Sequence, residues 1–458
     1  MTSFKPDRSS QLSSLILLLI TAWTFPFVAS YAVFVSSFRR LLRGKPSTSA
    51  PPTKTAIVTG GKMSKALFVA RYLKKAGCRV VLIETHKYHM VASRFASCID
   101  RFVTVPVPEQ SPKEYLSALK SLAYEEDADL FVPVSSPVAS VYDARVGGVL
   151  PPGCRTLSCG EVWTATLDDK VTFNELAKQA GLPAPDTRRM TSLEAITKFN
   201  DELLALGEGA TRYVLKSIAY DSMRRLDLFT LPASPAKLAE YTKDIGVSQS
   251  NPWLVQAFAS GTEYSTCAVA HKGALTFFTD NVASISCFNY EHAGTTALRH
   301  WVETFCRAHK LSGVVCIDFF IDAKGTPLAI ECNPRFSSNI ASFYDHPNIG
   351  RALLEPEECA ASGVVETPLP SHKETCWLGW ELYHAVTMPN ASLAHRAYSV
   401  YDAIANKKDA YWDPDDVLPF LALYYYHIPT LLVRNIQRGN TWAKIDLCIG
   451  KLTEVNGD

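Results

Sequence analysis

The chain has 458 residues, 47% hydrophobic and 11% aromatic, so it can bury a substantial core, and we expect two or three domains. Lys and Arg total 46 against 45 for Asp and Glu, and the net charge of +1 gives no electrostatic reason to expect nucleic acid as a partner. None of the 12 cysteines forms a C-x-x-C pair, which excludes the commonest zinc and redox motifs. Most of them lie in apolar runs, which indicates buried thiols in a reducing compartment.

The first predicted element is an uncharged run of 21 residues, Leu15–Val35, long enough to cross a bilayer as a helix that Pro26 would kink. More basic residues follow this run than precede it: Arg39, Arg40, Arg43 and Lys45 against Lys5 and Arg8. This asymmetry favours a membrane-associated protein whose main body is cytoplasmic. The alternative is a signal peptide cleaved near Ala29 and Ser30. The Pro-rich stretch 46–52 is typical of a linker.

The next segment predicts a β-α-β unit: a strand T-A-I-V-T-G-G, a helix over 63–76 and a strand R-V-V-L-I-E. Gly60, Gly61 and Glu84 resemble part of a dinucleotide fingerprint, but the third glycine is missing, which argues against NAD. A further strand, L-F-V-P-V, leads into the loop S-S-P-V-A-S. Ser135 and Ser136 in this loop are candidate substrate contacts, or residues of a plain turn.

A second α/β pattern begins at Asp168 and contains two lysines of interest. Lys170 precedes a helix that Gly181 ends, and Lys216 lies inside the strand R-Y-V-L-K-S-I. A lysine in an apolar strand is costly to bury without an anionic partner, so both lysines are candidate phosphate ligands. The alternative is that they lie along the surface with their ammonium groups in water.

The run W-L-V-Q-A-F-A-S-G-T-E-Y-S-T predicts a buried strand, a turn and a second strand. A flat purine can lie beside such a hinge and take backbone hydrogen bonds near Gln256, Ala257 and Phe258. Glu263, seven residues after Gln256, can accept hydrogen bonds from ribose hydroxyls.

The most informative segment, V-V-C-I-D-F-F-I-D-A-K-G-T-P-L-A-I-E-C-N-P-R, predicts a β-hairpin. If its turn centres on residues 324 and 325, Asp318 lies opposite Glu331, and Asn333 shares their face because side chains alternate along a strand. Opposed carboxylates repel, so the arrangement calls for a cation or a shifted pKa. Two carboxylates and an amide oxygen suit Mg²⁺ or Mn²⁺. The alternative is an edge hairpin with solvated acids.

Two lysines, a hinge strand, G-x-E and then D-(12 residues)-E-x-N follow the order of nucleotide and metal groups in the ATP-grasp superfamily, which residues 54 to about 350 resemble. The resemblance implies an α/β chain (α+β) with the ATP-grasp fold. It assigns Lys170 and Lys216 to the phosphates of ATP, Gln256, Ala257 and Phe258 to adenine, and Glu263 to ribose. Asp318, Glu331 and Asn333 would hold magnesium. Arg335, in N-P-R, resembles the arginine that neutralises the transferred phosphate.

The implied domains are a hydrophobic segment and linker (1–53), a Rossmann-like pre-ATP-grasp domain (54–165), an ATP-grasp domain (166–350) and a C-terminal region packed on the catalytic body (351–458). The last region contains the apolar, aromatic run 417–433, which predicts a buried or interfacial helix pair rather than a second membrane span.

The loop after Lys216, S-I-A-Y-D-S-M-R-R-L-D-L, lacks the glycines usual in the superfamily and instead resembles the mycosporine-glycine synthetases. Other segments similar to that family are G-G-K-M-S-K-A-L, E-T-H-K-Y, V-P-V-S-S-P-V-A-S, L-D-D-K, N-Y-E, E-C-N-P-R, F-Y-D-H-P and K-I-D-L-C-I-G-K-L. The resemblance implies ATP-dependent joining of 4-deoxygadusol, a cyclohexenone with an acidic enol, to glycine. It also covers the N-terminal hydrophobic stretch.

Residues for the acceptor side are candidates only. Arg224 and Arg225 can hold the glycine carboxylate, cap the phosphates or form a solvated charge pair. His86, Ser135, Asn281, Tyr290 and His346 lie in the family-like segments and either line the cyclohexenone pocket or serve packing. Two other functions stay open: a carboxylate-amine ligase acting through an acyl phosphate, and a membrane-tethered ATP-binding protein without turnover.

Overall fold

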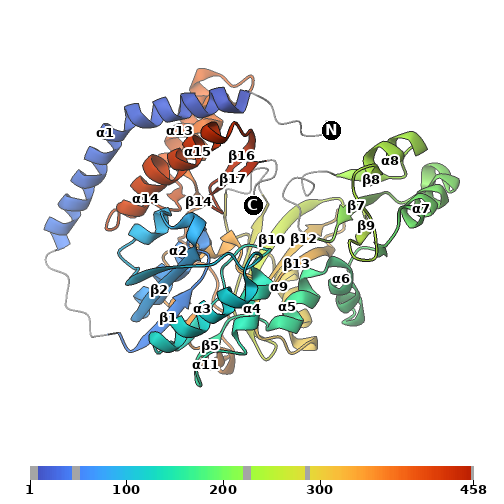
Figure 1. Ribbon diagram of the computed structural model, residues 1–458, viewed down its shortest axis with the longest axis horizontal. Helices are drawn as coiled ribbons and strands as arrows, with labels where there is room; N and C mark the ends of the chain where they lie inside the picture. The colour runs from blue at the N-terminus through green and yellow to red at the C-terminus, as the bar shows by residue number, and fades with distance from the viewer. Residues whose placement is uncertain (1–8, 44–51, 220–227, 284–288, 455–458) are drawn as a thin grey trace.

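The computed structural model describes residues 9–43, 52–219, 228–283 and 289–454, which form a mixed α/β chain built around three larger sheets (Figure 1). A long N-terminal helix and a mainly helical C-terminal region lie together at one end. The predicted fold class is confirmed at the level of these elements.

A parallel five-stranded sheet follows the N-terminal helix, in the order β3-β2-β1-β4-β5. Its strands are β1 Lys54–Val58, β2 Cys78–Thr85, β3 Arg101–Val105, β4 Leu130–Val132 and β5 Arg155–Thr156. Its helices are α2 Ser64–Lys75, η1 His86–Tyr88, η2 Ala92–Phe95, α3 Pro112–Glu125 and α4 Ser140–Val146. Alternate residues of β1 face opposite ways: Ala56 and Val58 join the core under α2, and Ile57 joins the core under α3. The predicted β-α-β unit is confirmed.

A smaller antiparallel sheet, in the order β6-β9-β7-β8, projects to one side of the molecule (Figure 1). It contains β6 Thr187–Met190, β7 Tyr213–Ser217, β8 Phe229–Leu231 and β9 Trp253–Ala257, with α7 Leu193–Ala205, η3 Gly207–Gly209 and α8 Pro235–Thr242 beside it. Two helices, α5 Glu161–Asp168 and α6 Lys170–Gln179, precede it. The Asp169 side chain caps α6 by accepting hydrogen bonds from the amides of Val171 and Thr172. Gly181, at a φ of 72°, follows the end of that helix as predicted.

The central antiparallel sheet runs β11-β10-β12-β13. Its elements are β10 Thr262–His271, β11 Ala274–Val282, α9 Thr296–Ala308, β12 Gly313–Ile321, β13 Pro327–Asn333, η5 Ser338–Phe343, α10 Ile349–Leu354 and α11 Pro356–Ser362. One face packs on α9 through Val315 and Ile317, and the other shares a core with α2 through Val314 and Cys316. The strand alternation therefore turns one face of this sheet toward the first domain.

The β12–β13 hairpin places Asp318 opposite Glu331 as predicted, although its turn differs from the prediction. Ile321 pairs with Pro327 around a five-residue loop, which alone would put Asp318 opposite Ile330. The register shifts after Asp318, which leaves Ile330 as an extra residue and restores the acid pair. A β-bulge next to the acids thus produces the register that a tighter turn would have given.

The C-terminal region packs on the first domain through Trp377, Tyr411 and Leu423, which share a core with α2. Its elements are β14 Thr375–Cys376, α12 Leu378–Thr387, α13 Leu393–Ala405, β15 Lys408–Asp409, α14 Leu418–Ala422, the π-helical η6 Leu423–His427, α15 Ile428–Arg438, β16 Trp442–Asp446 and β17 Lys451–Glu454. The predicted helix pair over 417–433 is therefore a run of α14, η6 and the start of α15.

The N-terminal helix, α1 (Ser9–Arg43), is continuous through Pro26 and curves over the C-terminal helices (Figure 1). Among the described residues it is the one helix long and apolar enough to cross a membrane, with a mean hydropathy of 2.0 in its most apolar stretch. A signal sequence near an N-terminus also meets these criteria of length and composition.

The contact between the C-terminal hairpin and the start of α2 supplies a stability test. Gly450 has a φ of 62°, and a Cβ added there would lie 2.3 Å from the carbonyl oxygen of Lys62. We expect Gly450→Ala to lower the free energy of unfolding by about 2–4 kcal/mol, since it combines a left-handed backbone with a backbone clash. Gly439→Ala, at a φ of 65° with open space around it, should cost about 1 kcal/mol. Equal losses in denaturant unfolding would show that the close approach is unimportant.

Candidate nucleotide and metal site

Four polar residues form a row across the whole central sheet. Asn281 lies opposite Ser265, Ser265 opposite Asp318, and Asp318 opposite Glu331. The Ser265 hydroxyl donates to Asp318 Oδ1 at 2.5 Å, and Asn333 Nδ2 donates to Asp318 Oδ2 at 3.1 Å. Because directly paired residues share a face, the row gathers acids, a hydroxyl and amides on one surface.

The two acids have opposite electrostatic surroundings. Burial and then the adjacent Glu331 charge raise the pKa of the Asp318 carboxyl well above its ordinary value. Burial also opposes ionisation of Glu331, but the charge and hydrogen bond of Lys170, the charge of Lys216 and a hydrogen bond from Asp318 together lower the pKa of Glu331 to about 2. Glu331 is therefore the ionised member of the pair, and Asp318 holds its proton more tightly until a cation offsets the repulsion.

The two predicted lysines approach these acids from different elements. Lys170, the first residue of α6, places its Nζ 2.8 Å from Glu331 Oε2. Lys216, in β7, donates from its Nζ to Gln256 Oε1 at 3.3 Å, and burial lowers its pKa. Glu331 is the largest charge influence on Lys170, raising its pKa, and a secondary one on Lys216. The structure thus gathers near Glu331 the two lysines that the sequence analysis predicted as phosphate ligands.

The hinge strand β9 lies against the bulge of β13. Gln256 is 2% exposed and donates from Nε2 to the carbonyl oxygen of Ile330 at 3.0 Å, so the bulged residue supplies the acceptor. The amides of Ala257 and Phe258 donate to the carbonyl oxygens of Asp186 (2.7 Å) and Arg212 (2.8 Å). Those donors are used inside the protein, so a purine at these residues would depend on other backbone groups of the hinge.

Glu263, at the start of β10, is exposed beyond the hinge. Partial burial and then the Glu331 charge raise the pKa of its carboxyl. Phe258 is 42% exposed on the other side of the turn. An acidic acceptor and an accessible aromatic ring therefore flank the hinge, as a ribose and a base would require.

Arg335 is buried and spans two elements. Its Nη1 lies 2.6 Å from Asp168 Oδ1, and its Nη2 donates to Asn333 Oδ1. The amide of Asn333 is thereby oriented, with its oxygen toward Arg335 and its nitrogen toward Asp318. Asn333 can ligate a metal through Oδ1 only if that oxygen turns away from Arg335.

Lys65 is a residue near this site to which the sequence gave no role. It lies in the first turn of α2, is 7% exposed, and donates from Nζ to the carbonyl oxygen of Phe336, next to Arg335. Burial, and then the Arg335 charge, lower the pKa of Lys65 to about 8. The sequence pattern did not reveal the burial of Lys65, because a lysine at the start of a helix is usually solvated. Through Lys65 the first domain contacts the loop that carries Arg335.

The remaining candidates are dispersed. Asn281 belongs to the polar row, and its Oδ1 is buried without a hydrogen-bond partner among residues 9–43, 52–219, 228–283 and 289–454. Tyr290 approaches Cys448, with 4.0 Å between the hydroxyl oxygen and Sγ. His86 is exposed beside Thr104, and His346 is buried 3.4 Å from Glu366. Arg224 and Arg225 lie outside the described residues.

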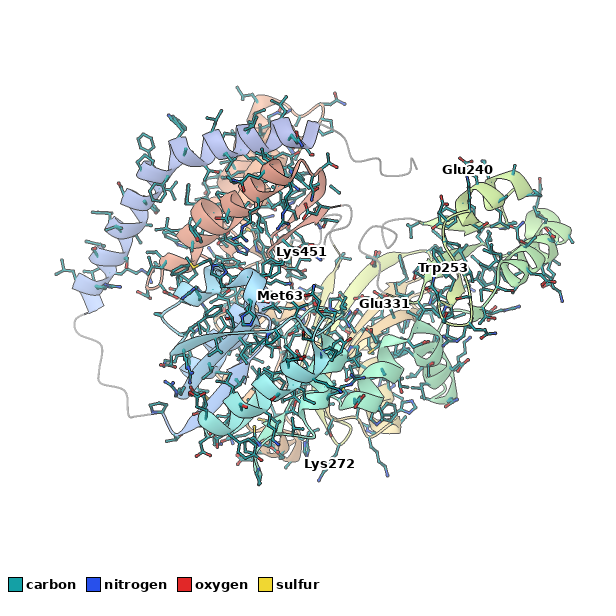
Figure 2. The ribbon with its side chains drawn as sticks, viewed as in Figure 1. Met63, Glu240, Trp253, Lys272, Glu331 and Lys451 are labelled. Atoms are coloured by element: carbon teal, nitrogen blue, oxygen red, sulfur yellow. The ribbon has the colours of Figure 1, made fainter. Side chains whose placement is uncertain are left out.

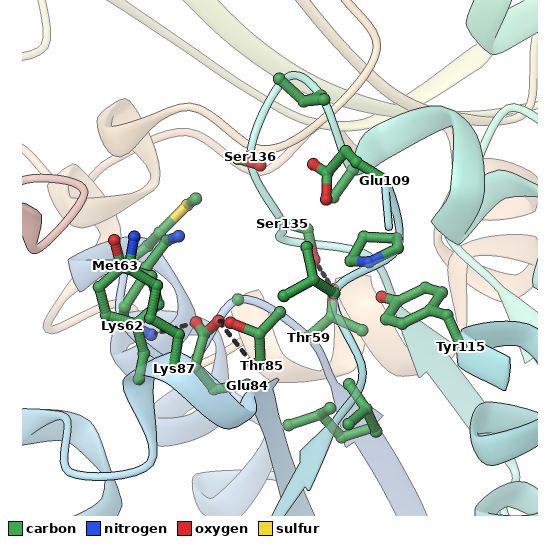
Figure 3. Close-up of a pocket in the computed structure, with 18 of the residues that line it drawn as sticks. Thr59, Lys62, Met63, Glu84, Thr85, Lys87, Glu109, Tyr115, Ser135 and Ser136 are labelled. Atoms are coloured by element: carbon green, nitrogen blue, oxygen red, sulfur yellow. Dashed lines mark hydrogen bonds between the residues drawn. The ribbon is translucent and has the colours of Figure 1, made fainter. Parts of the chain in front are cut away.

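A cavity of about 350 Å³ lies at the carboxyl ends of β1, β2, β3 and β4 (Figure 3). Thr59, Lys62, Glu84, Ser135 and Ser136 line it, and Ile449 and Lys451 of the C-terminal region close it. None of the predicted nucleotide or metal residues lines this cavity. The prediction that the S-S-P-V-A-S loop borders a pocket is thus confirmed, whereas its ligand is not identified by position alone.

A buried hydrogen-bond chain supports one wall of this cavity. Ser135 Oγ donates to Thr59 Oγ1 (2.8 Å), which donates to Asp143 (2.8 Å), and Tyr115 donates to the same carboxylate at 2.5 Å. Burial raises the pKa of Asp143 to about 6 despite these donors. With its proton committed to Thr59, the Ser135 oxygen is available as an acceptor toward the cavity (Figure 3).

The amides that would bind a dinucleotide at this sheet edge are used internally. The amide of Lys62 donates to Glu84 (2.8 Å), that of Gly61 to the carbonyl oxygen of Ile83 (3.0 Å), and that of Ser64 to the carbonyl oxygen of Cys448 (3.0 Å). Glu84 therefore holds the glycine turn rather than a ribose. This agrees with the sequence argument against NAD.

The acid pair suits a hard divalent cation. Two carboxylates and a nearby amide offer oxygen ligands only, which is the donor set of Mg²⁺ or Mn²⁺. The described part of the chain contains no group of three or more His, Cys, Asp or Glu side chains able to hold a metal, so the metal would need further oxygen ligands from a phosphate or water. Figure 2 places Glu331 between Met63 of the first domain and Trp253 of the smaller sheet in this view.

No protein-family profile matches this chain, and no curated protein sequence does. Solved structures are similar in fold. A carboxyaminoimidazole ribonucleotide synthase from Aspergillus clavatus, complexed with ATP, superposes with a TM-score of 0.51 at 14% identity, over 74% of this chain and 88% of that one. A phosphoribosylamine–glycine ligase from Thermotoga maritima gives 0.50 at 13% identity, over 70% and 78%. A Campylobacter jejuni biotin carboxylase gives 0.50 at 14% identity, over 69% and 72%.

These three proteins are ATP-grasp enzymes. This chain has the ATP-grasp fold. The expected superfamily fold is thus confirmed, and the identities of 13–14% limit the comparison to the fold.

The raised pKa of Asp318 predicts a pH-dependent stability difference. Its proton is held more tightly in the folded state, so the stability it contributes is present at low pH and lost as pH rises through the folded pKa. With EDTA present, Asp318→Asn should therefore exceed the wild type in unfolding free energy by about 1 kcal/mol above neutral pH, and the difference should shrink in acid.

The matched control is Asp322→Asn, in the loop of the same hairpin. Backbone amides, that of Thr326 first, lower the pKa of Asp322, so its contribution is present at neutral pH and the substitution should destabilise there. Unfolding curves across pH that move the same way for both variants would contradict the assigned repulsion between Asp318 and Glu331.

Proposed function

We propose that this protein is an ATP-dependent carbon-nitrogen ligase that joins glycine to 4-deoxygadusol and forms mycosporine-glycine. The observation that carries the ATP-dependent part is the Asp318–Glu331 pair, with Lys170 and Lys216 around it, in an ATP-grasp fold. The choice of substrates rests on the resemblance of the glycine-free loop after Lys216 and its companion motifs to the mycosporine-glycine synthetases.

In this proposal the polar row binds the triphosphate end of ATP. Asp318, Glu331 and Asn333 would hold Mg²⁺, which would offset the negative charge of the phosphates. Lys170, 2.8 Å from Glu331, and Lys216, which also feels the Glu331 charge, supply two ammonium groups for the phosphates. Gln256, through its hydrogen bond to the Ile330 carbonyl, fixes the hinge against the metal-bearing strand.

The chemistry needs a better leaving group than an enolate oxygen. Attack of the enol oxygen on the γ phosphorus forms an O–P bond, breaks the bond to the β-phosphate oxygen and releases ADP. The glycine amine then adds to the conjugated carbon, and elimination releases phosphate. Arg335 stabilises charge on the transferring phosphoryl group, and the proton lost by the ammonium passes to a base or to water.

The cavity at the end of the parallel sheet is the proposed acceptor site. Its hydroxyl-lined wall offers the Ser135 oxygen to ligand hydroxyls, and Lys62 adds a positive charge for an enolate. Residues next to the cavity lead toward the phosphate site: Met63 lines it, and Lys65, two residues on, contacts the loop of Arg335. An acceptor held here lies on the same side of the central sheet as the acid row.

Purified wild-type protein with 4-deoxygadusol, glycine and Mg-ATP should release ADP and shift the ultraviolet absorbance of the ring. Glu331→Gln should lower ADP release by at least about 100-fold, because it removes the charge that balances the cation and Lys170. ADP release with a carboxylate and an amine but without an absorbance shift would favour the acyl-phosphate ligase. ATP binding without any ADP release would favour a non-catalytic ATP-binding protein.

Ser135→Ala should raise the KM for 4-deoxygadusol about 3- to 10-fold and leave the KM for ATP unchanged, since one hydrogen bond to the acceptor is lost. Ser140→Ala is the matched control: Ser140 is a buried serine of the same loop whose hydroxyl donates to the Pro137 carbonyl (2.8 Å) and does not line the cavity. If the enzyme is active and both variants leave the KM for 4-deoxygadusol unchanged, the acceptor does not bind in this cavity.

A further inference from the structure

The distribution of apolar and polar side chains around helix α1 is the reverse of that on an ordinary surface helix. The most buried residues of α1 are small or polar: Ser10, Ser14, Ala32 and Ser36 are 0–7% exposed, and Leu17, Leu18 and Val28 are partly buried against the core. The spacings of 4, 18 and 4 residues between the four most buried residues are close to whole turns, so these four lie along one stripe of the helix. The side that contacts the protein is therefore the less apolar side.

The opposite side of α1 carries large apolar residues in the open. Leu19, Trp23, Phe27, Phe34, Leu41 and Leu42 are 65–80% exposed. A helix on a water-facing surface shows the reverse pattern, with its apolar stripe toward the core. Small and polar residues at the protein contact and large apolar ones outside is the arrangement of helices that face lipid.

Contacts to the C-terminal region fix α1 along most of its length. Trp442 Nε1 donates to Ser14 Oγ at 2.8 Å, the Tyr425 hydroxyl donates to Thr24 Oγ1 at 3.4 Å, and Arg39 lies 3.7 Å from Asp415. From Ser14 to Arg39 the helix rises about 38 Å, more than the hydrocarbon core of a bilayer. If α1 crossed the membrane upright in this arrangement, the part of the C-terminal region that lies beside the middle of the helix would enter the hydrocarbon, which is prohibitively costly for its polar groups.

Further exposed apolar residues lie on α12 and α13 of the C-terminal region, the region that α1 curves over (Figure 1). Val386 in α12 and Leu393 and Ile404 in α13 are 64–83% exposed. Arg39 and Arg40 lie near the end of α1, where they can meet anionic headgroups. The C-terminal region thus adds exposed apolar side chains to those of α1, and two arginines lie near one end of that helix.

We propose that α1 lies in the plane of a phospholipid surface, with its Leu19–Phe27–Phe34 side in the acyl region, its Ser14–Ala32 side on the C-terminal helices, and both of its ends on the same side of the membrane. This proposal replaces a membrane-crossing anchor by a surface-bound helix. It is independent of the proposed reaction, because none of its residues contacts the acid row or the cavity.

The first test is flotation of the full-length protein with phosphatidylcholine vesicles, with and without phosphatidylserine. The wild type should float, more so with phosphatidylserine. The double variant Leu19→Glu, Phe27→Glu should stay in the fraction that does not float with vesicles, and its Tm should equal that of the wild type. The control, Val162→Glu combined with Leu206→Glu, changes residues that are 77% and 69% exposed elsewhere and should float like the wild type.

Equal flotation of both double variants would overturn the proposal. The proposal would also be overturned if the wild type did not bind vesicles but formed a dimer that Leu19→Glu dissociates. A second copy of the chain would then cover the apolar side of α1.

The second test is topology in sealed membranes. A protease-sensitive epitope before Ser9 and one after Asp458 should be cleaved from the same side of the bilayer. Protection of the N-terminal epitope while the C-terminal one is cleaved would establish a crossing helix and refute the in-plane arrangement.

Discussion

The site depends on a repulsion: Asp318 faces Glu331 directly across a hairpin. Such a pair weakens a sheet unless something offsets it, and here Lys170 pairs with Glu331 while Ser265 and Asn333 donate to Asp318. These partners stabilise the Glu331 carboxylate more than the Asp318 carboxylate, so Glu331 is ionised and Asp318 retains its proton more tightly. A hard cation bound between the two acids would stabilise both negative charges at once, so the proposed metal site would offset the repulsion that weakens the hairpin.

The geometry that creates this repulsion also connects the domains. The bulge at Ile330 restores the acid register and supplies its carbonyl oxygen to Gln256 of the hinge strand. Arg335 links Asn333 to Asp168, at the end of α5, and Lys65 reaches the same loop from the first domain. A few charged contacts thus connect the domains to the acids, and the carboxylates of Asp168 and Glu331 offset the cost of burying the cations Arg335 and Lys170.

Much of the fold and of the candidate site could be predicted from the sequence, because strand alternation and glycine turns are local properties. The alternation of side chains along a strand was enough to place Asp318, Glu331 and Asn333 on one face. The β-bulge that produces the predicted register could not be foreseen from the sequence. Lys65 was missed since its burial depends on the docking of α2 against a loop 271 residues away. The hinge amides were assigned to a purine, yet their internal partners come from other strands, which no local pattern reveals.

The direction of α1 illustrates the same limit and joins the two ends of the molecule. Hydropathy counts identify an apolar helix, but whether its large or its small residues face the protein depends on the partner surface. Trp442, which starts β16, binds Ser14 of α1, and the segment after that strand supplies Ile449 and Lys451 to the cavity. One short hairpin thus contacts both the proposed lipid-facing helix and the proposed acceptor site. Gly450 of this hairpin also lies against the Lys62 carbonyl, so the hairpin connects α1 to the cavity wall through contacts that do not involve the acids.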